Sequence, residues 1–371
     1  MSDHESPLAR ERFARILATL DREGTVRASS IAAELGVTPV TVRRDLVRLE
    51  RDGLLKRVHG GAAPLRRSED RPRMADTVAP SRSSIATERP TIAVVVPSLD
   101  YYWPGVLGGM KDRAEQLGMR VLMREGSYRL QDERPLLEEV VRGGEVTGLI
   151  VAPNPTAQHA RDVIDWITTS GVPTVLVERD ADGPDRMPLE SVVTDHGLGA
   201  VLAARHLRDL GHRRVGLVLA RDSPTSRRIA AGWRRACREL GLSPSEHLER
   251  VFPDRGSPDF SEAVGAMLDA AVGSGVTGLL VHSDPEAMAV VDLARARGID
   301  VPGSMSVVAY DDEIARLYSP ALTAVSPPRA AVGATSIDLL VARLRDPSRP
   351  ASRVVLSPTL HVRESTRAPR A

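Results

Sequence analysis

The sequence is poor in cysteine and in long apolar runs, and each shortage excludes a class of protein. Cys237 is the only cysteine among 371 residues, which excludes an intrachain disulfide and a cysteine-based metal cluster. No segment approaches the roughly 18 consecutive apolar residues of a membrane span. The start, MSDHESPLARERFARIL, lacks the apolar stretch of a signal peptide. We therefore expect the chain to stay in the cytoplasm.

Signatures of common enzymes are also missing. The sequence contains no G-x-G-x-x-G after a strand, no G-x-x-x-x-G-K-[ST], no G-x-S-x-G and no H-E-x-x-H. These are the patterns of nucleotide binding, serine hydrolysis and zinc proteolysis. The nine histidines are scattered, and we interpret His206 and His212 as a helix residue and a turn residue rather than metal ligands. We expect no enzyme activity, no cofactor and no bound metal.

The N-terminal part of the chain has the pattern of three short helices. Residues 8–23 carry apolar side chains at helical spacing, and the stretch SSIAAELG forms a second helix opened by Ser29 or Ser30. A third helix begins with Thr38 as the N-cap and Pro39 in its first position. Two short helices joined by a tight turn predict a helix-turn-helix.

Basic charge is concentrated around this third helix. The whole chain has 50 basic and 49 acidic residues and a formal charge of +1, so its net charge alone indicates no partner. From Thr41 to Arg67, however, eight Arg or Lys residues stand against three acidic ones. A recognition helix inserts its N-terminal residues into the major groove, while flanking cations hold phosphates. This charge pattern predicts a double-stranded DNA partner.

The candidate DNA contacts follow from the helix geometry. Val42, Leu46 and Leu49 share one apolar stripe, which turns the arginines of the helix outward. The stretch GLLKRVHGG then predicts a short hairpin wing whose cations reach phosphate or the minor groove. The candidates are Ser29, Thr38, Pro39, Thr41, Arg43, Arg44, Arg48, Lys56, Arg57 and His59.

A change of composition separates this head from the rest of the chain. Residues 66–90 are rich in Arg, Ser and Pro and lack hydrophobic periodicity, which indicates a linker between residues 1–65 and 91–371. After it, fully apolar runs alternate with helical patterns, as in parallel sheets covered on both faces. We predict an α/β domain of two lobes. Lobe 1 takes about 91–190 and 318–346, and lobe 2 takes about 191–317 and 347–371.

Two family resemblances support this division. Residues 12–63, with the words TVRRDL and RVHGGA, resemble the winged helix-turn-helix of the DeoR family of transcriptional regulators. A sugar-phosphate-isomerase-like domain usually follows such a head. Residues 91–366 instead resemble the effector domain of the LacI/GalR family, through TIAVVVP, SVVTDHGLGA, VHSDPEAMA and VRESTR. This resemblance implies a periplasmic-binding-protein-like (type I) domain of two doubly wound parallel sheets.

Aromatic residues are scarce, yet three of the eleven are consecutive: Tyr101, Tyr102 and Trp103. In the LacI/GalR family two lobes close over a small polar ligand at the carboxyl ends of strands. The triplet lies in the loop after the first strand of the domain. Aromatic faces stack on a pyranose or on a base, and their O–H and N–H groups bond hydroxyls. Consecutive loop residues point in different directions, so we do not expect all three in the core.

The resemblance also implies polar ligand contacts. Glu178 and Arg179 match the acid–arginine pair of the family, and Asp284 matches its acidic ligand contact. Asp311 or Asp312 could line the hinge or the pocket. For Asp284 a helix-capping role is equally compatible, and for Asp312 it is the preferred interpretation.

Two further regions of the sequence contain weaker candidates for effector contacts. Arg124, Ser127 and Tyr128 end the second strand beside the aromatic loop. Where the family pattern has a ligand-binding arginine, this sequence has Ile229, with Arg228 one position earlier. An unshifted helix turns Arg228 by about 100° away from the ligand.

Together these features predict a cytoplasmic transcriptional regulator that binds operator DNA, is a homodimer and responds to a small sugar-like effector. We expect a repressor of carbohydrate-utilisation genes, although corepression would use the same fold. A sugar-phosphate-processing enzyme or a sugar-binding transport receptor with a fused head is the alternative. The winged head argues against the first, and the missing signal peptide argues against the second.

Overall fold

The computed structural model describes two units of the chain, Met1–Ile85 and Ala86–Ala371. In the first unit the described residues are 15, 16, 19, 20, 26, 27, 30–32, 42, 46, 49, 56–58 and 61–63. In the second they are 89–143, 146–221 and 223–369.

The first unit has a small antiparallel sheet and a helical core. Strands β1 (Val26–Arg27), β2 (Lys56–Val58) and β3 (Gly61–Ala63) are ordered β1-β3-β2, and β2 and β3 form the hairpin expected for a wing. Val42, Leu46 and Leu49 are helical and buried, in agreement with the predicted apolar stripe. Their spacing places them on one face of a helix.

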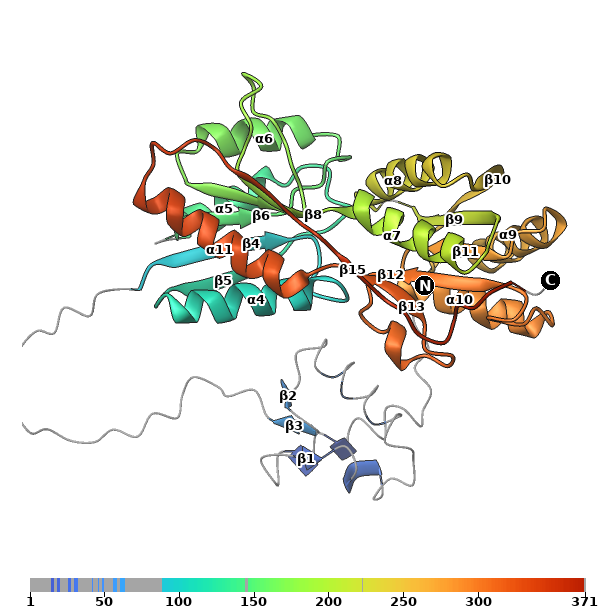
Figure 1. The fold of residues 1–371 in the computed structure, drawn as a ribbon. Helices are drawn as coiled ribbons and strands as arrows, with labels where there is room; N and C mark the ends of the chain where they lie inside the picture. Colours follow the sequence, from blue (N-terminus) through green and yellow to red (C-terminus); the bar gives the residue numbers. More distant parts are fainter. Residues whose placement is uncertain are drawn as a thin grey trace, which may run out of the picture. The chain divides into compact units, whose positions relative to one another are not determined.

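Lobe 1 of the second unit is built on a parallel sheet (Figure 1). Its order is β14-β8-β7-β6-β4-β5, and every neighbouring pair is parallel. The strands are β4 (Thr91–Val96), β5 (Arg120–Glu125), β6 (Val146–Val151), β7 (Thr174–Val177), β8 (Ser191–Thr194) and β14 (Arg353–Leu356). The helices are α4 (Trp103–Gln116), α5 (Arg134–Arg142), α6 (Ala160–Thr169) and α11 (Arg329–Arg345).

Side-chain alternation along β4 explains why both faces of this sheet are covered. Ile92, Val94 and Val96 face one core, which includes residues of α4 and α11, whereas Ala93 and Val95 face another, which includes residues of α5 and α6. A strand buried on both faces needs an unbroken apolar run, and TIAVVV supplies it.

Lobe 2 repeats this plan, with sheet order β10-β9-β11-β12-β13-β15. All neighbouring pairs are parallel except β13 and β15. The strands are β9 (Arg214–Ala220), β10 (Ser243–Phe252), β11 (Gly278–Val281), β12 (Ser306–Tyr310), β13 (Thr323–Ser326) and β15 (Thr359–His361). Helices α7 (His196–Asp209) and α8 (Ser226–Glu239) contribute to one core, and α9 (Phe260–Gly273) and α10 (Asp284–Ala296) to the other. A short 3-10 helix, η1 (Ala315–Leu317), follows β12.

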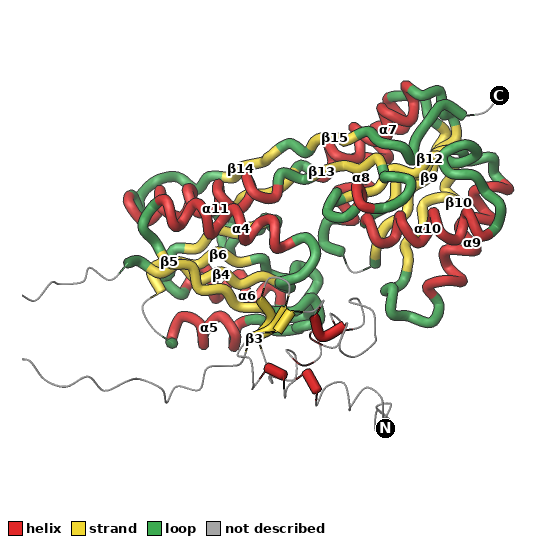
Figure 2. The backbone as a smooth tube through the Cα atoms, turned by 90° about the horizontal axis from the view of Figure 1, so that it is seen from below, coloured by secondary structure: helices red, strands yellow, loops and turns green. Residues whose placement is uncertain are grey.

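The sheet topology corrects the predicted lobe boundaries. Strands β8 and β14 belong to the sheet of lobe 1, although the prediction assigned both to lobe 2. Strand β13 belongs to lobe 2, although the prediction assigned it to lobe 1. The chain therefore crosses between lobes three times, after β8, after β13 and after β14. Figure 2 labels the elements on either side of the last two crossings, β13 with α11 and β14 with β15. Apolar runs predict strands, but they do not indicate which of two similar sheets a strand enters.

Candidate functional site: the interlobe cavity

A cavity of about 880 Å³ lies between the two lobes. Lobe 1 lines it with residues that follow β4, β5, β6 and β7, and lobe 2 with residues that follow β9, β10, β11 and β12. Loops at the carboxyl ends of parallel strands are where α/β proteins bind ligands. The volume lies within the range of small-molecule sites, about 300–1,000 Å³.

The aromatic triplet forms one wall of this cavity. Tyr101, Tyr102 and Trp103 all line it, and their polar atoms contact different partners: Asp284, Glu178 and Tyr128. Trp103 is only 2% exposed, belongs to the core of lobe 1, and donates its indole N–H to the Tyr128 hydroxyl at 3.1 Å. Pro104 in the first turn of α4 is compatible with a helix that starts here, because its ring favours the first helical position. Trp103 thus joins the cavity wall to the core.

Tyr101 instead reaches across to lobe 2. Its hydroxyl accepts the backbone N–H of Asp284 at 3.3 Å, and its backbone φ is 56°. A non-glycine residue in this left-handed region is strained, and such strain persists where surrounding contacts hold it. Burial, together with the nearby carboxylates of Asp311 and Asp284, raises the pKa of Tyr101, so its hydroxyl stays protonated.

Glu178 is the centre of a dense hydrogen-bond network on the lobe 1 wall. Its carboxylate accepts from the Tyr102 hydroxyl and from the hydroxyl and backbone N–H of Thr194, at 2.8 and 3.0 Å. His196 Nε2 lies 3.4 Å away. Burial opposes the charged form, but the interaction with His196, together with the hydrogen bonds from Tyr102 and Thr194, lowers the pKa of Glu178 to about 2. Glu178 is therefore an ionised residue that fixes Tyr102.

Arg179 presents a buried guanidinium to the same cavity. It is 6% exposed, and it donates Nε to the Pro153 carbonyl at 3.1 Å and Nη1 to the Glu178 carbonyl at 2.7 Å. Among the residues that the structure describes, no carboxylate forms an ion pair with it. A guanidinium has five N–H donors, so this geometry leaves donors for ligand hydroxyls.

Asp311 and His282 form part of the opposite wall. Burial raises the pKa of Asp311 to about 6, although electrostatic interactions with His196 and Arg329 oppose this shift. His282 Nε2 lies 4.0 Å from the Asp311 carboxylate and 3.4 Å from the Thr225 hydroxyl. Burial lowers the pKa of His282 to about 4, so this imidazole is neutral near pH 7.

His196, Thr225 and His282 are cavity residues that the sequence analysis did not select. Each follows a strand: His196 comes shortly after β8, Thr225 after β9 and His282 directly after β11. Polar residues at the ends of apolar runs were the signal that could have identified them, because those ends meet at one edge of each sheet.

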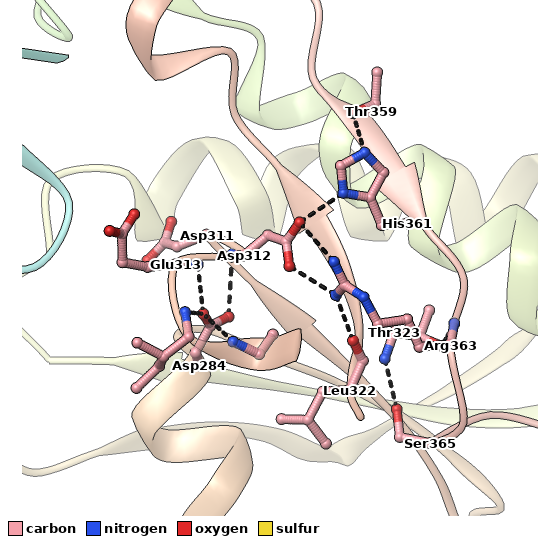
Figure 3. Close-up of polar contacts among 12 residues, drawn as sticks. Asp284, Asp311, Asp312, Glu313, Leu322, Thr323, Thr359, His361, Arg363 and Ser365 are labelled. Atoms are coloured by element: carbon pink, nitrogen blue, oxygen red, sulfur yellow. Dashed lines mark hydrogen bonds and ion pairs between the residues drawn. The ribbon is translucent and has the colours of Figure 1, made fainter. Parts of the chain in front are cut away.

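Asp284 does not line the cavity, which corrects its predicted role as a ligand contact. It is fully buried, and its carboxylate accepts four backbone N–H groups, from residues 312–315, at 2.7–3.1 Å (Figure 3). Asp284 therefore shapes the loop that presents Asp311. The helix cap is Ser283, which forms a capping box with Glu286.

Asp312, next to Asp311, is also used structurally. Figure 3 shows its carboxylate held by Arg363, at 2.7 and 3.0 Å, and by His361, at 2.6 Å. These contacts favour its charged form and lower its pKa, although burial opposes the shift. Asp311 therefore lines the cavity, whereas Asp312 anchors the C-terminal segment through Arg363 and His361.

Arg124 and Arg228 also lie outside the cavity lining. Arg124 is exposed on the edge strand β5 and donates to the Met123 carbonyl at 3.3 Å. Arg228 forms an ion pair with Asp180, and Ile229 is fully buried in the core of lobe 2. In this structure Arg228 is paired with Asp180 instead of lining the cavity. Ser127 and Tyr128 do line the cavity.

The described part of the chain shows no group of three or more His, Cys, Asp or Glu residues placed to hold a metal ion. His206 contacts the Thr366 hydroxyl, and His212 contacts the Thr277 hydroxyl and the Arg367 carbonyl. Cys237 is buried, and burial raises the pKa of its thiol to about 12.

None of the helices described is long and apolar enough to cross a membrane.

Most predicted DNA contacts lie outside the described residues. These are Ser29, Thr38, Pro39, Thr41, Arg43, Arg44, Arg48 and His59. Lys56 and Arg57 lie on β2, one strand of the hairpin.

Comparisons with known proteins identify both units. Residues 12–67 match a DeoR-like helix-turn-helix domain, and residues 204–366 match a periplasmic binding protein-like domain. The HTH-type transcriptional regulator DegA of Bacillus subtilis is 28% identical over 279 residues, which are 74% of this chain and 80% of that protein. The HTH-type transcriptional regulator MalR of Streptomyces coelicolor is 28% identical over 357 residues, which are 92% of this chain and 97% of that protein.

A solved structure gives the same result. The lac repressor dimer bound to operator and the anti-inducer ONPF is 26% identical, with a TM-score of 0.64 over 76% of this chain and 96% of that chain. These relatives are regulators of transcription and not enzymes. The chain is therefore a transcriptional regulator that joins a DeoR-like helix-turn-helix to a two-lobed periplasmic-binding-protein-like domain.

Proposed function

We propose that the chain is a repressor of carbohydrate-utilisation genes whose affinity for operator DNA is controlled by a neutral sugar in the interlobe cavity. The observation that carries this proposal is the cavity itself, at the carboxyl ends of both sheets, with aromatic rings and the buried Arg179 on its lobe 1 wall. The lac repressor, which shares this fold, is bound to operator and an anti-inducer in its solved structure.

The cavity lining favours an uncharged effector. Four arginines and four carboxylates line it, so its formal charge is balanced. Arg129 and Asp254 neutralise each other, and Glu178 is held by hydroxyl and amide donors. A volume of about 880 Å³ accommodates at least a disaccharide. Hydroxyls of such a sugar would accept hydrogen bonds from Arg179, and its C–H faces would pack against the tyrosine rings.

The proposed effector contacts are those predicted residues that reach the cavity, with three additions from the structure. They are Tyr101, Tyr102, Trp103, Ser127, Tyr128, Glu178, Arg179 and Asp311, joined by His196, Thr225 and His282.

The proposed DNA contacts are the predicted residues of the helix-turn-helix and its wing, in a head of residues 1–65 joined by the linker 66–90. The protein would act in the cytoplasm, where its DNA lies, as a homodimer on two half-sites related by two-fold symmetry. Arg43→Ala or Arg44→Ala should abolish specific operator binding and leave effector binding intact. An unchanged operator affinity in a gel-shift titration would remove these arginines from the interface.

A thermal-shift screen tests the effector class. Maltose, cellobiose, arabinose, glucose 6-phosphate and nucleosides are added to the full chain, because a ligand that binds the native state raises its melting temperature by mass action. A neutral sugar should stabilise the protein and change its affinity for an operator selected from random DNA. If only glucose 6-phosphate or the nucleosides stabilised the protein, the proposal of a neutral sugar effector would be contradicted. Tighter rather than weaker DNA binding would indicate corepression.

A further inference from the structure

Besides the pair of Arg329 with Glu313, beside the crossover after β13, two more exposed ion pairs bridge the lobes near the cavity. Asp180 follows β7 in lobe 1, directly after Arg179, and it pairs with Arg228 in the first turn of α8 in lobe 2. Their side chains are 45% and 34% exposed. The pair lies next to the cavity lining without being part of it, because Arg179 and Thr225 line the cavity on either side of the cleft.

The second pair stands at the cavity wall itself. Arg129, after β5 in lobe 1, donates Nη2 to the carboxylate of Asp254, after β10 in lobe 2, at 3.2 Å. Both residues line the cavity, and their side chains are 87% and 65% exposed. The Tyr101 hydroxyl, which accepts the Asp284 N–H, is a third contact across the same gap.

These contacts across the cleft can form only when the two lobes are close together. The lobes are connected by three crossovers, after β8, β13 and β14, and opening about such short segments is a hinge motion. The side chains of both pairs come from opposite lobes, so separation of the lobes must break the pairs. Ordinary surface ion pairs, such as Lys111 with Glu115 within α4, are unaffected by that motion.

We propose that the Asp180–Arg228 and Arg129–Asp254 pairs are electrostatic straps that hold the cleft closed before an effector enters. Their effect on effector sensitivity rests on the proposed function, but the bias toward the closed state does not. Exposed ion pairs contribute little individually and are screened by salt, so each strap should change the ratio of open to closed forms by about 1.5- to 5-fold.

The lobe separation can be measured without an effector. Spin labels are attached to cysteines introduced at Lys111 on α4 and Val272 on α9, both exposed and in different lobes. The native thiol should not compete, because Cys237 is buried and its pKa is raised to about 12. Labelled chains are diluted into excess unlabelled chains, so that distances within one protomer dominate the pulsed electron-resonance signal.

The following variants distinguish the loss of a specific ion pair between the lobes from a general change in surface charge. Asp180→Asn and Arg228→Gln should each increase the long-distance population by about 1.5- to 5-fold. The charge-swapped double variant, Asp180→Arg with Arg228→Asp, should restore the wild-type distribution. Asp185→Asn and Arg227→Gln change exposed neighbours that do not line the cavity, and they should have no effect. Raising the salt from roughly 0.05 M to roughly 1 M should open the wild type, and it should open Arg228→Gln less, because of the two straps only the Arg129–Asp254 pair remains to be screened in that variant.

Distributions that are identical in the wild type, in both single variants and at both salt concentrations would overturn the proposal. So would a double variant that opens further than the single variants. This outcome is independent of the sugar screen. Failure of every neutral sugar to stabilise the protein would contradict the proposed function, whereas the strap measurement uses the ligand-free chain.

Discussion

The two walls of the cavity use the same kind of residue in opposite ways. Glu178 on the lobe 1 wall and Asp311 on the lobe 2 wall are 4% and 6% exposed, and both have left-handed φ angles, 54° and 95°. The pKa of Glu178 is about 2, but that of Asp311 is about 6. Burial raises both values, and only Glu178 has enough donors to reverse the shift.

This difference shows how each wall is built. On the lobe 1 wall Trp103, Tyr102 and Glu178 are linked by ring contact and hydrogen bonds, and Trp103 continues into the core. On the lobe 2 wall His282 has a buried Nδ1 without a hydrogen-bond partner. The first wall is therefore a rigid extension of the core, and the second retains polar groups whose hydrogen bonds are incomplete.

The largest effect is expected from Trp103→Ala. Because the indole is buried in the core of lobe 1, its truncation should cost about 3–5 kcal/mol of unfolding free energy. Urea unfolding at pH 7 measures this cost. Trp103→Phe keeps most of the ring and serves as the control. An equal, small loss in both variants would show that the lobe 1 wall is not continuous with the core.

A smaller but substantial loss is expected from Glu178→Gln. The amide would place an N–H₂ group against the donors of Tyr102 and Thr194, at a cost of roughly 2–3 kcal/mol near pH 7. The stability contribution of the ionised Glu178 is present above its unfolded pKa and is lost as the pH falls from about 4 through its folded pKa of about 2. Wild-type stability at neutral pH in Glu178→Gln would refute this network.

Asp311→Asn should reveal the opposite pH dependence. The folded pKa of Asp311 is raised to about 6, so its stability contribution is fully present below the unfolded pKa of about 4 and is lost as the pH rises through 6. The wild type should therefore gain stability relative to Asp311→Asn when the pH is lowered from about 7.5 to about 4.5. Urea midpoints at both pH values measure the difference, and parallel curves would contradict the assignment.

The smallest effect is expected from Arg124→Ala. Arg124 is exposed on an edge strand and lies outside the cavity lining, so its loss should change unfolding free energy by less than about 0.5 kcal/mol and leave sugar binding unchanged. Arg179→Ala is the matched comparison, because that arginine is buried in the cavity wall. Loss of the sugar response in Arg124→Ala would place the effector elsewhere.

The sequence predicted a large part of this arrangement for local reasons. Unbroken apolar runs such as TIAVVV indicated buried parallel strands, and the scarcity of aromatic residues made the triplet at 101–103 conspicuous. The resemblance to the LacI/GalR family implied Glu178 and Arg179, and it left Asp311 and Asp312 as alternatives; Glu178, Arg179 and Asp311 line the cavity. Asp284 was misplaced because a carboxylate at a strand end serves equally well as a ligand contact or as an acceptor for loop amides.

The sequence by itself determined the order of helices and strands and the division into a DNA-binding head and an α/β domain, because hydrophobic periodicity and charge patterning act over short segments. Only the tertiary structure decided which sheet received β8, β13 and β14, and which acidic and basic residues face the cavity. The physical reason is that these outcomes depend on partners distant in the chain. Glu178 and Asp311 owe their opposite pKa shifts to donors that only the folded chain brings together.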